Sequence, residues 1–106
     1  MKPSAFAVLA ALAEGPVAGF GVLERVNRNS PGRPVLGPGT LYRLLRELRR
    51  SGLIERTEPP PGEAAANDER RTYHRLTVKG RRALEAEAER LRRTMQAAGL
   101  LGRATR

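Results

Sequence analysis

The segment from Gly37 to Gly52 separates apolar from cationic residues in the pattern of a helix with two unlike faces. Its leucines recur at intervals of three and four residues, which is the spacing of an apolar stripe that packs on a core. At ~100° per residue, most of its arginines lie about 140–200° away from that stripe. Pro38 suits the first turn of this helix, and Gly52 suits the position just after its last residue. The stripe is Leu41, Leu44, Leu45 and Leu48, the opposite face holds Arg43, Arg46 and Arg50, and Tyr42 and Arg49 share one flank.

Two interpretations of this cationic face are open. In the first, it is an ordinary solvated surface on which Glu47 pairs with Arg43 or Arg50. In the second, it binds a polyanion, because one acid cannot neutralise four arginines and a helix in the major groove of DNA needs such donors. The rest of the chain favours the second interpretation.

The composition limits the classes of protein to which the chain can belong. Its 106 residues suffice for one domain with a single core. A net charge of +9 and an isoelectric point near 11.5 favour an acidic partner, above all nucleic acid. The absence of cysteine excludes a disulfide framework and a thiol nucleophile. Without a signal-peptide core or a membrane-length apolar run, a cytoplasmic protein with no membrane partner is expected.

Motifs for catalysis or cofactor binding are missing from the sequence. His74 is the single histidine and lacks a nearby nucleophile pattern, so we expect it at the surface or at a sheet edge. Phosphate-binding and dinucleotide-binding glycine motifs do not occur, and neither does the spacing of metal ligands. The sequence therefore predicts a protein that is not an enzyme and uses no cofactor.

The N-terminal third is predicted to hold two helices. Residues 4–13 form a helix, with Ser4 as its N-cap, that is apolar nearly all round. Such a helix is buried on more than one side, within its own domain or also against a second chain. A second helix is predicted over 18–29, and 29–36 form a loop with room for a very short strand at 34–36.

After Gly52 the pattern changes from helical spacing to alternation, which is typical of strands. Residues 53–58 and 70–76 are predicted to form a hairpin, with a mobile tip at 59–69. Thr77 is a suitable N-cap for a long last helix over 78–98. The predicted fold class is mainly α with a small two-stranded β-hairpin: a winged helix-turn-helix with a long C-terminal dimerisation helix.

Short stretches between about residues 7 and 80 occur in a distinctive order and spacing. They are Leu12-Ala-Glu-Gly-Pro-Val with Gly19-Phe20, Pro38-Gly-Thr-Leu-Tyr, Leu48 with Gly52-Leu-Ile-Glu, Arg71-Thr-Tyr-His-Arg-Leu-Thr, and Gly80. In these the chain resembles the PadR-like family of winged helix-turn-helix transcriptional regulators, in its short subfamily with a single helix after the wing. It departs from the family at Ala18, where a His is usual, at Phe20, where a Tyr is usual, and at Gly37, where a Ser is common.

The resemblance implies a sequence-specific regulator of transcription, a homodimeric repressor on a palindromic operator in double-stranded DNA. Residues 1–76 would be the winged-helix DNA-binding domain, 77–99 the dimerisation helix and 100–106 a tail. Thr40 and the first-turn N–H groups would hold a phosphate. Arg43 and Arg46 would read base edges, and the later arginines would meet phosphates. The implied DNA-binding residues are Pro38, Gly39, Thr40, Tyr42, Arg43, Arg46, Arg49, Arg50, Arg70 and Arg71; for Tyr42 a place at the edge of the core remains an alternative.

The last helix carries an apolar seam that steps by four, three and four residues, like the a and d positions of a coiled coil. It is too short to dimerise alone, so the first helix is expected to contribute. The predicted dimer interface is Phe6, Leu9, Leu84, Ala88, Leu91 and Met95. The alternative is that this seam packs only on its own domain.

Two further expectations concern partners. A winged-helix module that binds RNA or another protein is the alternative function, although aromatic residues for base stacking are few, at 4%. Some members of the family sense hydrophobic compounds with tryptophan side chains. This chain has no tryptophan, so any small-molecule effector stays unidentified.

Overall fold

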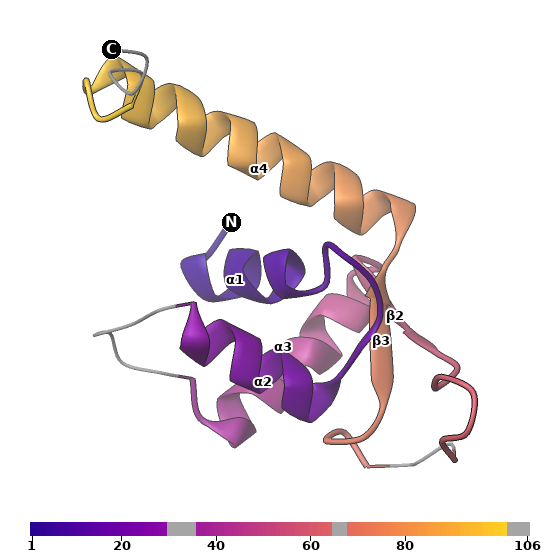
Figure 1. The fold of residues 1–106 in the computed structure, drawn as a ribbon. Helices are drawn as coiled ribbons and strands as arrows, with labels where there is room; N and C mark the ends of the chain where they lie inside the picture. Colours follow the sequence, from indigo (N-terminus) through magenta and orange to yellow (C-terminus); the bar gives the residue numbers. More distant parts are fainter. Residues whose placement is uncertain (30–35, 65–67, 102–106) are drawn as a thin grey trace.

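The computed structural model describes residues 1–29, 36–64 and 68–101 and confirms a mainly α-helical fold with a small antiparallel sheet (Figure 1). Three helices precede the β2–β3 hairpin, and one long helix follows it. The described elements are α1 (Pro3–Ala11), β1 (Val17–Ala18), α2 (Gly19–Arg28), α3 (Pro38–Arg50), β2 (Ile54–Thr57), β3 (Tyr73–Leu76) and α4 (Val78–Ala97). We use the word wing for β2, β3 and the described residues between them, 58–64 and 68–72.

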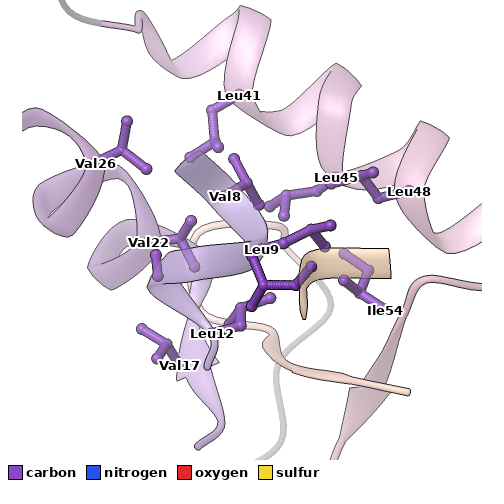
Figure 2. Close-up of a cluster of buried hydrophobic side chains, with 12 residues drawn as sticks. Val8, Leu9, Leu12, Val17, Val22, Val26, Leu41, Leu45, Leu48 and Ile54 are labelled. Carbon is purple, nitrogen blue, oxygen red and sulfur yellow. The ribbon is translucent and has the colours of Figure 1, made fainter. Parts of the chain in front are cut away.

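Helix α1 is buried by its own chain over most of its surface, whereas Phe6 is half-buried and Ala10 is exposed. It packs against both α2 and α4. The side chains of Val8, Leu9 and Leu12 are at most 1% exposed. Figure 2 shows them gathered with Leu41 and Leu45 of α3 in one apolar cluster. Full burial of such a side chain contributes about 1.5–3 kcal/mol relative to exposure, so this cluster is the main source of stability.

The sheet has three strands in the described residues, with β3 between β1 and β2. Strand β1 pairs antiparallel with β3, so that Val17 lies opposite His74. Only the β2–β3 pair was predicted, because β1 is two residues long and shows no alternation. The extra strand ties the start of α2 to the wing, since the N–H groups of Gly19 and Phe20 donate to carbonyls of the wing.

The end of α3 and the start of α4 meet at Gly52 and Leu53. Gly52 has a φ of +79°, and the N–H groups of Gly52 and Leu53 donate to the carbonyls of Arg49 and Leu48, which is a Schellman cap. The Thr77 hydroxyl accepts from the Gly80 N–H at 2.9 Å and donates to the Gly52 carbonyl at 2.6 Å. The predicted stop at Gly52 and the predicted N-cap at Thr77 are both confirmed.

Helix α4 crosses α1 and continues beyond the rest of the chain (Figure 1). Arg81 near its start donates to the carbonyl of Ala13 at 2.8 Å, while Arg25 of α2 donates to the carbonyl of Ala11 at 2.9 Å. Two guanidinium groups therefore satisfy carbonyls at the C-terminal end of α1, where positive charge is favourable. Beyond Leu84 every described residue of α4 is exposed or half-buried.

The helix ends differ in detail from the prediction. Helix α1 begins at Pro3, with Lys2 and not Ser4 at the N-cap position. Proline suits this position because the first helical N–H has no intrahelical acceptor. The short strand expected at 34–36 falls, apart from Leu36, outside the described residues, and so does part of the hairpin tip, at 65–67.

Candidate nucleic-acid interface

Helix α3 presents a cationic face to solvent. Its apolar stripe is buried, with Leu41 and Leu45 at 0% exposure and Leu48 at 5%. The arginines opposite are all exposed, and none of them forms an ion pair or hydrogen bond within the described part of the chain. Glu47 is also exposed and, over the same ranges, does not pair with Arg43 or Arg50. Since these charges are not neutralised within the chain, the face can bind a polyanion. The exposed arginines are Arg43, Arg46 and Arg50.

The N-terminal turn of α3 is open to solvent. Pro38, Gly39 and Thr40 are exposed, and Gly37 at the N-cap provides no side-chain hydrogen bond. The first intrahelical bond of this helix is donated by Leu41 to the Gly37 carbonyl. The N–H groups of the first turn thus point outward with the positive end of the helix dipole behind them, as a phosphate requires.

Tyr42 lies at the boundary between this surface and the core. It is half-buried and packs against the apolar cluster together with Leu44. The structure thus shows the core-edge packing that was one of the two alternatives for Tyr42. Because the residue is only half-buried, part of it remains available at the surface.

Arg49 does not lie on the free cationic face. Its Nη1 and Nη2 donate to the two carboxylate oxygens of Glu69 at 3.2 and 2.9 Å, and Nη1 lies 2.8 Å from Nε2 of His74. The side chains of Arg49 and Glu69 are only 17% and 20% exposed. The prediction that Arg49 meets a DNA phosphate is therefore at odds with its place in the structure. Both of its partners are more than 19 residues away, so no local pattern could reveal them.

His74 is fully buried, so the expectation of a surface or edge histidine was wrong. Strand β1 covers the edge at which His74 would otherwise be exposed. A guanidinium group only donates, so Nε2 must accept from Arg49 and the proton of the neutral ring lies on Nδ1. Burial and the neighbouring charge of Arg49 lower the pKa of His74 to about 4. The ring is therefore neutral at pH 7.

The same neighbours also affect the carboxyl group of Glu69. Burial alone would raise the pKa of its carboxyl group, but the hydrogen bonds and the charge of Arg49 outweigh burial and lower the pKa below its ordinary value. At neutral pH the three side chains therefore hold one cation, one anion and one neutral acceptor.

The two arginines of the wing differ in their surroundings. Both are exposed, but Arg71 forms a surface ion pair in which its Nε lies 3.7 Å from Oδ2 of Asp68. Arg70 forms no ion pair within the described residues. Beside them a shallow hollow of about 430 Å³ is lined by Phe20, Tyr73 and Glu63, among others. The Tyr73 hydroxyl donates to the Glu63 carboxylate in this hollow, 3.1 Å from its nearer oxygen.

The predicted dimer residues fall into two groups. Leu9 and Leu84, at 0% and 8% exposure, belong to the core of the single chain, so they are not free to contact a partner. Ala88 and Met95 are exposed, and Leu91 and Phe6 are half-buried. The apolar seam of α4 therefore has two parts. Leu84 packs in the core of its own chain, whereas Ala88, Leu91 and Met95 are exposed or half-buried.

The described residues also bear on metal binding and on membrane insertion. Across residues 1–29, 36–64 and 68–101, His, Asp and Glu side chains form no group that could hold a metal ion. No helix in these ranges has both the length and the apolar character needed to cross a membrane.

These elements define a winged-helix protein with one long helix after the wing. The sequence profile described as the transcriptional regulator PadR-like family matches residues 8–86. The chain therefore belongs to the PadR-like family of transcriptional regulators, and its class is that of winged-helix proteins that regulate transcription by binding DNA.

Solved structures of other proteins share this fold. A PadR family transcription regulator from Clostridium difficile R20291 superposes with a TM-score of 0.72 at 21% identity, covering 90% of this chain and 93% of that one. A transcriptional regulator from Clostridium thermocellum superposes with a TM-score of 0.68 at 22% identity, covering 90% of this chain and 85% of that one. Bacillus subtilis PadR, solved in complex with operator DNA, superposes with a TM-score of 0.67 at 17% identity, covering 82% of this chain and 47% of that one. None of the curated proteins matches the chain.

Proposed function

We propose that this protein is a non-catalytic, homodimeric repressor that binds a specific operator in double-stranded DNA, in the cytoplasm. The observation that carries the proposal is the exposed face of α3, where Arg43, Arg46 and Arg50 lack acidic partners among the described residues. Bacillus subtilis PadR, which shares the fold, was solved with its operator bound. Repression would follow if the operator overlaps a promoter and the bound dimer excludes the polymerase.

Each surface of the interface has its own role in this proposal. Arg43 and Arg46 read base edges in the major groove, because they lie on the free face in the first two turns of the helix. Thr40 and the N–H groups beside Pro38 and Gly39 hold a phosphate at the helix dipole. Arg50 contacts the backbone further along, and Tyr42 contacts a sugar or phosphate with its exposed part.

The wing adds backbone contacts outside the major groove. Arg70 is the stronger candidate, because Asp68 already pairs with Arg71. Contacts of this kind position the protein but carry no sequence information directly. We therefore assign specificity to α3 and orientation to the wing.

The dimer is proposed to form through the outer part of α4. Ala88, Leu91 and Met95 follow one another at helical spacing on the part of α4 where every described residue is exposed or half-buried. Phe6, half-buried on α1, extends the same contact. A twofold dimer places its two α3 helices on half-sites one helical turn, ~34–36 Å, apart, so the operator is expected to be palindromic.

A small-molecule effector is the remaining proposed partner. Bordetella bronchiseptica BpsR, of similar fold, is regulated in its DNA binding by 6-hydroxynicotinic acid, and this chain aligns with only part of it. Here the hollow beside Phe20 and Tyr73 adjoins the wing arginines. A molecule bound there would compete with the proposed backbone contact of Arg70.

The proposal is tested by fluorescence anisotropy with duplex DNA from upstream of the gene and a shuffled duplex of equal length. A specific regulator is expected to prefer one genomic duplex by ~10³-fold or more. Its log affinity should fall with log salt by ~0.9 for each phosphate neutralised. If the upstream duplex shows no preference, selection from genomic fragments extends the search. Equal or tighter binding to single-stranded RNA would contradict the proposal and favour the alternative function.

A further inference from the structure

Arg49 joins three parts of the chain through a single guanidinium group. It belongs to α3, it is held at both amino groups by Glu69 of the wing, and it donates to His74 of β3. A bidentate pair of this kind fixes the orientation of the guanidinium group as well as its distance from the carboxylate. We call Arg49, Glu69 and His74 the Arg49 cluster.

The backbone around Glu69 is fixed from a second side. The N–H of Phe20 donates to the Arg70 carbonyl at 2.8 Å, and the N–H of Gly19 donates to the Thr72 carbonyl at 3.0 Å. The Glu69 carbonyl lies so close to Gly19 that a Cβ at that position would overlap it. Glu69 is thus the point where the wing touches both α2 and α3.

We propose that Glu69, Arg49 and His74 position the wing against α3, so that Arg49 acts in DNA binding as a positioning residue and not as a phosphate contact. This inference rests on the proposed function, because it assigns a task to residues beside the proposed DNA surface. Arg70, the wing residue proposed to reach the DNA backbone, directly follows Glu69. Loss of the cluster would therefore leave α3 intact and free Arg70 from its fixed place.

The charges of the cluster agree with this role. Glu69 neutralises Arg49, so Arg49 adds little net attraction for phosphate. His74 accepts from Arg49 only while its ring is neutral, and protonation would place two cations side by side. The charged groups near the His74 ring are Arg49 from α3, Glu69 from the wing and Arg56 from β2, while β1 presents Val17.

The first test compares Glu69→Gln with Arg49→Gln in operator binding. Both variants are expected to lower the preference for operator over shuffled DNA by about tenfold, which corresponds to ~1.4 kcal/mol. The double variant should lose no more than either single variant, because residues that act as one unit are not additive. If Arg49 instead contacted a phosphate directly, only Arg49→Gln would weaken DNA binding. In that variant the slope of log affinity against log salt would fall by ~0.9, and in Glu69→Gln neither the affinity nor the slope would change.

Glu63→Gln is the matched control. It removes the same charge from the same wing, but Glu63 accepts from Tyr73 and not from Arg49. The preference for operator should stay within about twofold of wild type, well inside the tenfold effect expected above. An equal loss in Glu63→Gln and Glu69→Gln would assign the effect to wing charge and overturn the positioning role.

A second measurement decides the inference without DNA, so that its failure is distinguishable from failure of the proposed function. Amide hydrogen exchange is followed in the free protein at Gly19 and Phe20, whose N–H groups bond to the wing. Glu69→Gln should speed exchange at both amides by about tenfold or more relative to Val26 in the core, because local opening lowers protection. Unchanged exchange at Gly19 and Phe20 would show that the cluster does not hold the wing.

Discussion

Arg43, Arg46 and Arg49 share one helix but have different surroundings. The first two are exposed on the free face, whereas Arg49 is largely enclosed by Glu69 and His74. At the scale of single residues, replacing Arg46 by Ala is expected to weaken operator binding and to relax the preference at one base pair. The cost should be about 1–3 kcal/mol if the contact is bidentate. Fluorescence anisotropy with operator duplexes that carry single base-pair substitutions measures both the loss of affinity and the change in preference.

Arg93→Ala is the matched control for that experiment. It removes the same charge from the outer part of α4, where Glu89 keeps its ion pair with Arg92. Only a non-specific loss of affinity is expected there. If Arg46→Ala weakened binding to every sequence by the same factor, Arg46 would be a phosphate contact and not a base reader.

His74 gives the second prediction at this scale. Its pKa is lowered to about 4 in the folded chain, against 6.5 ordinarily, so the unfolded chain binds the proton first as pH falls. Stability should therefore decrease between pH 6.5 and about 4, by on the order of 3 kcal/mol. Urea unfolding at several pH values measures this. In His74→Gln, whose amide oxygen can still accept from Arg49, the part of this decrease that lies above the titration range of carboxylates should be absent. If that part persisted, His74 would not be its source.

The surroundings of Arg49 and His74 mark the limit of inference from the sequence. Helical spacing placed Arg49 correctly on a flank of α3, but its partners at 69 and 74 are set by the fold. The alternation over 70–76 placed His74 on a strand, but not beneath a third strand of two residues. Side chains on regular elements were predictable, and contacts between distant elements were not.

At the scale of elements, backbone atoms pack closely at the joint between α3, β2 and α4. A Cβ added at Gly80 would overlap the Leu53 carbonyl, which already accepts from the Thr77 N–H. Because backbone atoms cannot move aside as a flexible side chain can, Gly80→Ala should destabilise the fold by about 1–3 kcal/mol. Urea unfolding followed by circular dichroism measures the change.

Gly39→Ala is the corresponding control. Nothing lies within 4 Å of a Cβ at this position, which is in the first turn of α3. Alanine is the better helix former, so stability should stay level or rise by up to about 1 kcal/mol. Equal destabilisation in both variants would show that close packing at Gly80 is not the cause.

The hairpin, helix α3 and the caps at Gly52 and Thr77 were predictable because each has a local signal, whereas the N-cap of α1 was not. Gly52 and Thr77 marked the two ends of the joint, and alternation marked both strands of the hairpin. Strand β1 had no such signal, since two residues cannot show a period. Strand β1 forms because it pairs with the free edge of β3, and the position of that edge cannot be read from the sequence.

The whole molecule is elongated, with extents of 50, 30 and 25 Å, because α4 continues past the helical core (Figure 1). The outer part of α4 carries Leu91 and Met95 where its own chain covers them only in part. If this surface forms the dimer, a charge at its centre should separate the subunits. Leu91→Glu is therefore expected to reduce the sedimentation mass from two chains to one chain of 11.6 kDa, since an unpaired carboxylate in an apolar contact is strongly unfavourable.

The same variant also tests how the dimer serves DNA binding. A single chain keeps α3 and the wing, so its affinity for one half-site should be unchanged. Its affinity for the full palindrome should fall by about 10²-fold or more, because the second half-site no longer benefits from a high effective concentration. Arg82→Glu, at an exposed position near the start of the same helix, introduces a carboxylate outside the proposed contact and should leave the mass at two chains. If Leu91→Glu instead kept the mass of two chains, the dimer would have to use another surface, and half-site spacing could no longer be inferred from α4.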